Sequence, residues 1–98
     1  MINRIVRMSF EPSKAKEFVA LFDSVKDQIA GFEGCEGLIL LRDAESENVF
    51  LTYSYWQSES HLNKYRFSNL FKTTWAETKA LFNDKPVAWS CVVAQKVK

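Results

Sequence analysis

The sequence is poor in the residues that build metal sites, disulfide frameworks and hydrolytic triads. It has one histidine, His61, and two cysteines that lie far apart, Cys35 and Cys91. No group of His, Cys and carboxylates has metal-ligand spacing, and no Ser-His-Asp or Cys-His arrangement can be recognised. We therefore expect no metal and no cofactor. We interpret both cysteines as small buried apolar residues of a reduced compartment.

An excess of charge of one sign and long apolar runs are also missing. Lys and Arg number 13 against 12 Asp and Glu, so electrostatics give no reason to expect a nucleic acid or an anionic membrane as partner. No apolar run reaches the roughly 20 residues that span a bilayer. The first residues, Met1 to Val6, are typical of a strand rather than of a signal peptide. We expect a cytoplasmic protein with no nucleic-acid and no membrane partner.

Hydrophobic periodicity predicts a single domain over residues 1–98, without linkers or repeats. Ile2, Val6, Met8 and Phe10 alternate as in a strand, whereas the apolar residues between 18 and 32 recur at helical spacing. The predicted elements are a strand over 2–10, a helix over 13–30, strands over 38–41 and 49–56 joined by a hairpin loop, helices over 59–65 and 68–82, and a strand over 87–97.

The order of these elements predicts an α+β, ferredoxin-like β-α-β-β-α-β fold, with a four-stranded antiparallel sheet and the helices on one face. Such a sheet usually carries polar residues on its uncovered face. Here Leu38–Leu41 and Val49–Trp56 are apolar on both faces. An uncovered apolar face of that size is uncommon in monomers. We therefore predict a homodimer that packs sheet against sheet around a two-fold axis.

Short motifs resemble the antibiotic biosynthesis monooxygenase (ABM) family. They are Tyr55–Ser60, with its Trp-x-Ser step, Ser68–Phe71, Trp75, and Phe32–Gly37 before a strand. The resemblance implies a dimeric α/β barrel of two ferredoxin-like subunits. It also implies small-molecule chemistry, since the family includes cofactor-free oxygenases of anthrones and quinols, haem-degrading enzymes and isomerases.

The resemblance places a pocket between sheet and helices, beside Trp56. This residue would wall the pocket and could donate a hydrogen bond through its indole N–H, or it is a core aromatic at the end of a strand. Phe67, Phe71 and Trp75 lie on or near the later helix, where they could bind substrate or fill the core. Tyr65 could donate to a substrate carbonyl.

Arg7 and Asn3 share one face of the first strand. Arg7 could hold a phenolate or carboxylate if that face meets the pocket, or it could lie at the dimer interface. His61 is the most obvious candidate for a general base near neutral pH, or it is a partly exposed helix residue. We predict Trp56, His61 and Arg7 as catalytic residues. The predicted substrate-binding residues are Phe67, Phe71, Trp75, Tyr65 and Asn3.

Three positions depart from the family's pattern. Val6 stands near an expected asparagine, Trp75 near an expected haem-ligating histidine, and Leu70 near a histidine of some oxygenases. These departures make haem degradation improbable and weaken an anthrone-specific assignment. The leading hypothesis is a cofactor-independent monooxygenase acting on a small aromatic or quinol-like substrate. The alternative is a non-catalytic, ligand-binding or scaffold dimer of the same fold.

Overall fold

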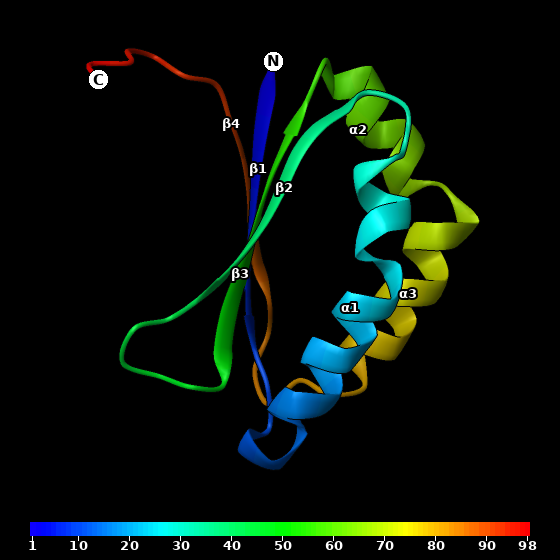
Figure 1. The fold of residues 1–98 in the computed structure, drawn as a ribbon, viewed down its shortest axis with the longest axis vertical. Helices are drawn as coiled ribbons and strands as arrows, with labels where there is room; N and C mark the ends of the chain where they lie inside the picture. The colour runs from blue at the N-terminus through cyan, green and yellow to red at the C-terminus, as the bar shows by residue number, and fades with distance from the viewer.

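The predicted α+β ferredoxin-like fold is confirmed. In the computed structural model, which describes all 98 residues, four antiparallel strands form one sheet in the order β2-β3-β1-β4. All three helices cover one face of this sheet, and the other face is uncovered (Figure 1). The elements are β1 (Ile2–Ser9), a 3₁₀ turn (Pro12–Lys14), α1 (Ala15–Ala30), β2 (Cys35–Arg42), β3 (Val49–Trp56), α2 (Glu59–Arg66), α3 (Asn69–Lys79) and β4 (Val87–Cys91).

The helix ends follow local chemistry. Pro12 opens the turn before α1, where its missing N–H costs nothing. The Ser58 hydroxyl accepts a hydrogen bond from the backbone N–H of His61, and Ser68 does the same for Phe71, so serines cap both later helices. Gly31 ends α1.

Several element boundaries differ from the prediction. β1 ends at Ser9 rather than 10, because Phe10 forms only an isolated bridge with Phe82, and α3 ends at Lys79 rather than 82. β2 begins at Cys35 rather than 38, with a register shift between Cys35 and Gly37. β4 ends at Cys91 rather than 97. Its last pair is with Asn3, and β1 itself begins one residue earlier, so β4 has no partner strand beyond this point. The chain then leaves the sheet at its edge (Figure 1).

The core lies between the sheet and the helices at the end of β1. Met8, Phe10, Phe18 and Phe50 form its buried cluster. Phe10 is fully buried and stacks on Phe18 with ring centroids 4.2 Å apart. Aromatic packing here ties α1 to the two central strands. Two of these core residues, Met8 and Phe18, also line the cavity described below.

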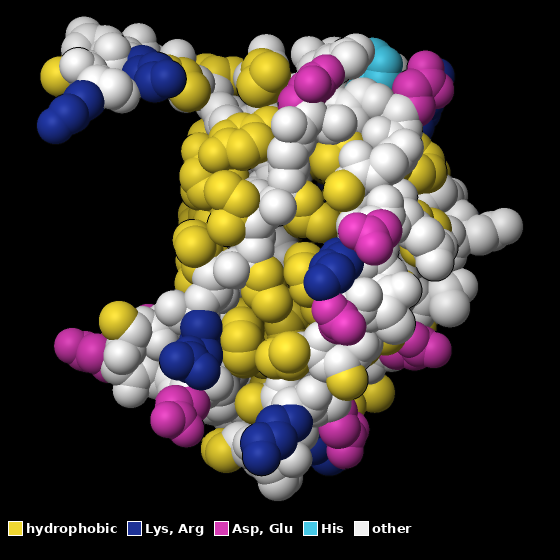
Figure 2. All heavy atoms as spheres, in the orientation of Figure 1, with side chains coloured by type: hydrophobic (Ala, Val, Ile, Leu, Met, Phe, Trp, Pro, Cys, Tyr) yellow, Lys and Arg dark blue, Asp and Glu magenta, His cyan; other side chains and the backbone are white.

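The uncovered face of the sheet, called the outer face below, is apolar and exposed. Ile39, Leu41, Val87 and Trp89 each expose more than 40% of their surface, and Figure 2 shows hydrophobic atoms gathered along this side of the sheet. Cys91 is exposed here and Cys35 is half-buried, which corrects the expectation that both cysteines are buried. The strands that carry them, β4 and β2, lie at the two edges of the sheet.

No helix is both long and apolar enough to cross a membrane. The cytoplasmic location stays a prediction of the sequence.

Candidate functional site

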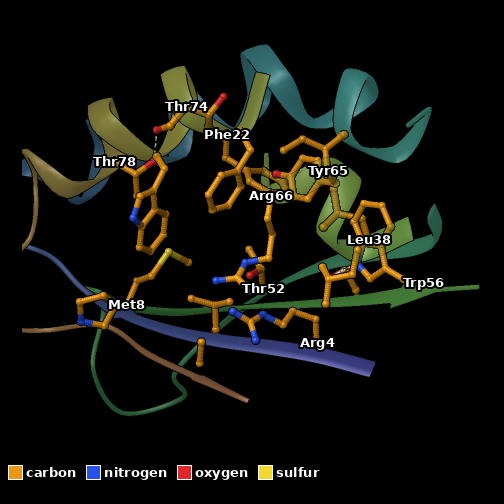
Figure 3. Close-up of a pocket in the computed structure, with 18 of the residues that line it drawn as sticks. Arg4, Met8, Phe22, Leu38, Thr52, Trp56, Tyr65, Arg66, Thr74 and Thr78 are labelled. Carbon is orange, nitrogen blue, oxygen red and sulfur yellow. Dashed lines mark hydrogen bonds between the residues drawn. The ribbon is translucent and has the colours of Figure 1, made fainter. Parts of the chain in front are cut away.

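A cavity of about 310 Å³ lies between the sheet and the helices. This is the lower end of the range for small-molecule sites. Of its 19 lining residues, 12 are hydrophobic, tyrosine included. The remaining ones are Arg4, Thr52, Ser54, Arg66, Thr74, Thr78 and Pro86. The cavity is thus an apolar pocket with a small set of polar groups (Figure 3).

An unbroken series of aromatic rings forms part of its wall. Trp56 stacks on Tyr65 at 4.9 Å between ring centroids, and Tyr65 meets Phe71 edge-on at 5.2 Å. Phe71 in turn stacks on Trp75 at 5.8 Å, with the ring planes only 11° apart. These contacts fix the rings against one another, so the cavity presents flat aromatic surfaces to a ligand.

The indole N–H of Trp56 is hydrogen-bonded within the chain. Its side chain is 1% exposed, and its Nε1–H donates to the Ser54 hydroxyl at 2.9 Å. The sequence left open whether this N–H donates to a substrate, and in the structure it is paired within the chain. Trp56 contributes a ring to the wall, and its polar atom stabilises the inner face of β3.

Two arginines bring positive charge to the cavity. Arg4 is half-buried on β1, and its guanidinium donates to the Ser90 hydroxyl at 2.9 Å. Arg66 ends α2 and is exposed. Figure 3 shows both side chains reaching toward the same part of the cavity from opposite layers. Burial, and secondarily the charge of Arg66, lowers the pKa of Arg4.

The one other titratable group in the cavity wall is Tyr65. Burial raises its pKa to about 12, with a smaller contribution from the neighbouring Cys35. Its phenol is therefore neutral at physiological pH and can donate a hydrogen bond. No carboxylate and no imidazole lines the cavity.

Four of the predicted site residues lie together at this cavity: Trp56, Tyr65, Phe71 and Trp75. They come from the end of β3 and from the two later helices. Their roles in binding or catalysis stay predictions. Val6 and Trp75, two of the positions that depart from the family's pattern, also line the cavity, so its wall is apolar there.

Arg7 and Asn3 do not line the cavity, so the face of the first strand that they share is not the one that meets it. Strand alternation turns them to the outer face, because it is Arg4 and Val6 that face the helices. Asn3 is buried there between its register partners Tyr55 and Cys91.

His61 and Phe67 also lie outside the cavity lining. The His61 ring packs on Gly34, where a Cβ would come within 2.4 Å of its atoms, and its Nδ1 lies 2.7 Å from the Ser58 hydroxyl. His61 thus holds the start of α2 against the loop before β2. Phe67 is 75% exposed, because it follows the last residue of α2 and turns to solvent.

Sequence reasoning missed Arg4 and Arg66. Arg4 lies between Ile2 and Val6 at the same strand parity, so alternation alone turns it inward. Arg66 follows Leu62 by four residues, which places both on one face of α2. A charged residue at an apolar-face position was the signal in both cases.

No group of three or more His, Cys, Asp or Glu side chains could hold a metal ion. The cavity also offers no imidazole to a haem iron.

These features define a ferredoxin-like α+β protein with a ligand-sized aromatic cavity between its layers. The family model for antibiotic biosynthesis monooxygenases matches residues 1–77, and the chain belongs to this family. No curated protein matches the sequence.

Solved structures share the fold at low sequence identity. Rv0793 from Mycobacterium tuberculosis is 16% identical, with a TM-score of 0.89 over 99% of this chain and 98% of its own. SnoaB, a cofactor-independent oxygenase from Streptomyces nogalater, is 16% identical, with a TM-score of 0.87 over 98% and 95%. A conserved protein from Methanosarcina mazei Go1 is 19% identical, with a TM-score of 0.88 over 92% and 89%. At such identities the likeness shows the fold alone.

Proposed function

We propose that the protein is a cofactor-independent monooxygenase of a small aromatic or quinol-like substrate, bound in the cavity between the sheet and the helices. The observation that carries the proposal is the cavity itself, about 310 Å³ with aromatic rings along its wall. Membership of the monooxygenase family supports it. The shared fold of SnoaB, a cofactor-independent oxygenase, adds a precedent for this chemistry on this scaffold.

Cofactor-free oxygenation places the redox chemistry on the substrate. An activated CH₂ group of an anthrone, or a phenolic O–H of a quinol, loses a proton, and the resulting enolate or phenolate reduces O₂ at a ring carbon that carries hydrogen. One oxygen atom becomes a C=O group and the other leaves as water, so the substrate supplies all four electrons. The protein must hold the ring, stabilise the anion and restrict water.

The residues of the cavity suit these tasks. Trp75 and Phe71 offer stacked rings to an aromatic substrate. The positive charge of Arg4 and Arg66 would stabilise the substrate anion and so lower the pKa of the bound substrate. Neutral Tyr65 can donate to a developing oxyanion. Because no carboxylate or imidazole lines the cavity, water would accept the proton.

The proposal includes a homodimer formed through the outer face. Ile39, Leu41, Val87 and Trp89 are between 42% and 44% exposed and belong to β2 and β4. Burying these side chains against a second copy would remove apolar surface from water, at about 25 cal/mol per Å². The antiparallel sheet leaves no helix of the chain to cover them (Figure 1).

Oxygen uptake tests the activity. The protein is incubated aerobically with a panel of hydroquinones and anthrones, and we expect uptake above buffer for at least one. Val6→Phe narrows the cavity and should reduce the rate at least tenfold. The matched control Val19→Phe adds the same ring to the exposed surface of α1 and should retain activity. Absence of uptake with every compound would contradict the proposal.

A second candidate, a non-catalytic ligand-binding dimer, is favoured by one observation. The cavity wall lacks a carboxylate or imidazole base, and the Trp56 N–H is already bound to Ser54. This candidate predicts tight, reversible binding of an aromatic ligand without oxygen uptake.

A further inference from the structure

The two arginines of the cavity lack a carboxylate partner in the chain. The one side-chain ion pair within 4.0 Å joins Lys26 to Asp23, on the surface of α1. Arg4 has only the neutral hydroxyl of Ser90 as a side-chain partner. Two guanidinium groups therefore face the same part of a largely apolar cavity that has no negative charge among its lining residues (Figure 3).

This arrangement is electrostatically unfavourable for the Arg4 guanidinium. The guanidinium of Arg4 is partly removed from water, and the charge of Arg66 acts on it from the facing layer. Both effects disfavour the charged form that arginine always keeps. An anion between the two groups would reverse both effects, because it supplies hydrogen-bond acceptors and cancels the repulsion.

The geometry points to Arg4 and Arg66 as a subsite for an oxyanion carried by an aromatic ligand. This inference rests on the proposed substrate cavity and names the chemistry of its ligand. The ring system lies along Phe71 and Trp75, and a carboxylate or an ionised phenol directly attached to it lies between the two guanidinium groups. The planar fork of arginine matches such oxygens.

The different exposure of the two arginines gives them different roles in binding the anion. Arg66 is exposed, so it can attract an anion from solvent. Arg4 is half-buried on the central strand β1, so its hydrogen bonds to the anion form in a less polar environment and are stronger. The apolar lining then orients the remainder of the ligand.

Isothermal titration calorimetry with bicyclic probes tests the subsite. At pH 7, 2-naphthoate carries a carboxylate, whereas 2-naphthalenemethanol has similar size without charge. We expect the carboxylate to bind at least tenfold more tightly than the alcohol. Arg4→Gln and Arg66→Gln should each weaken naphthoate binding about tenfold or more and leave binding of the alcohol within twofold.

The ionised phenol is tested with 2-naphthol at pH 7 and pH 10.5. Tyr65, which lines the cavity, stays largely neutral at both pH values because its pKa is about 12. Tighter binding at the higher pH that disappears in Arg4→Gln would identify a phenolate as the anion. Binding of naphthoate alone would identify a carboxylate.

Arg7→Gln is the matched control. It removes the same charge from the same strand, but on the outer face, and should leave naphthoate affinity within twofold. Arg4→Lys should restore part of the affinity lost in Arg4→Gln, because lysine keeps the positive charge without the planar guanidinium.

Thermal unfolding without ligand checks that the variants fold. Arg4→Gln should melt no lower than wild type, because it removes the repulsion with Arg66.

Equal binding of naphthoate and alcohol, failure of both anions to bind at millimolar concentration, or equal losses in Arg7→Gln and Arg4→Gln would overturn the inference. These binding measurements involve no turnover. If the anions bind through Arg4 and Arg66 but no substrate consumes oxygen, the subsite stands and the monooxygenase proposal fails. If oxygen uptake is unaffected by Arg4→Gln and Arg66→Gln, the subsite fails and the monooxygenase proposal stands.

Discussion

Each face of the sheet carries a group of side chains that is uncommon in half-covered sheets. The face covered by the helices carries the charged and hydroxyl groups Arg4, Thr52 and Ser54, all of which line the cavity. The outer face, open to water, carries exposed aliphatic and aromatic side chains such as Ile39 and Trp89. We propose that the polar groups on the covered face bind a ligand and that the apolar groups on the outer face contact a second copy of the chain.

The largest effect is expected from charging the outer face. The double variant Ile39→Glu/Trp89→Glu places two carboxylates where we propose the dimer interface, and like charges would meet across the two-fold axis. Sedimentation velocity at micromolar concentration should show a dimer for wild type and an 11.3 kDa monomer for the variant. Val19→Glu, at a site on α1 that is equally exposed (44%, as for Trp89), should stay dimeric. A monomeric wild type would exclude the dimer.

The next largest effect is expected on the free energy of unfolding, when a core side chain on the covered face is truncated. Phe10 is fully buried and contacts the rings of Phe18, Phe50 and Phe82. Phe10→Ala should lower the free energy of unfolding by about 3–5 kcal/mol. The same change at exposed Phe67 should alter it by less than about 0.5 kcal/mol. Urea denaturation followed by circular dichroism measures both, and similar losses would contradict the location of the core.

The buried phenol of Tyr65 predicts a loss of stability at alkaline pH. In the unfolded chain a tyrosine ionises near pH 10, whereas Tyr65 in the folded chain keeps its proton up to about pH 12. The raised pKa therefore contributes stability that is fully present below pH 10 and is lost as the pH rises toward 12. At about 1.4 kcal/mol per pKa unit, the loss is about 3 kcal/mol.

Urea midpoints at pH 9 and pH 11 check this prediction. Wild type should lose more stability between these values than Tyr65→Phe, which has no phenol to ionise. An identical pH dependence in the two proteins would show that the Tyr65 hydroxyl is not buried in the cavity wall.

The smallest effect concerns the hydroxyl that accepts the Trp56 indole N–H. Ser54→Ala leaves this buried donor without its partner and should cost about 1–2 kcal/mol of unfolding free energy. Ser90→Ala removes an exposed hydroxyl at the other register partner of Arg4 and should cost less than about 0.5 kcal/mol. Thermal denaturation distinguishes the two, and equal costs would mean that the Trp56 hydrogen bond is not buried.

Much of the fold could be predicted from the sequence, because strand and helix periodicities are strong in this chain. The alternation of apolar and polar residues predicted β1, and Ser58 predicted the N-terminal cap of α2. The end of β4 could not be predicted, because it depends on where β1 stops offering hydrogen bonds rather than on residues 92–97 themselves.

The candidate site was predicted less well, for a physical reason. The aromatic wall was found because Trp56, Phe71 and Trp75 stand out by size. The polar groups were not, because Arg7 and His61 stand out only by residue type, and the sequence left open which face of the first strand meets the pocket. Strand alternation turns Arg4, rather than Arg7, to the covered face.

A crystal structure of the protein grown with 2-naphthoate tests the central claim most directly, because it shows which face of the sheet binds the ligand. We expect the naphthyl ring to lie in the cavity against Phe71 and Trp75, with the carboxylate oxygens of naphthoate within hydrogen-bond distance of Arg4 and Arg66. A naphthoate bound on the outer face at Trp89, or one in the cavity with its carboxylate turned away from both arginines, would contradict it.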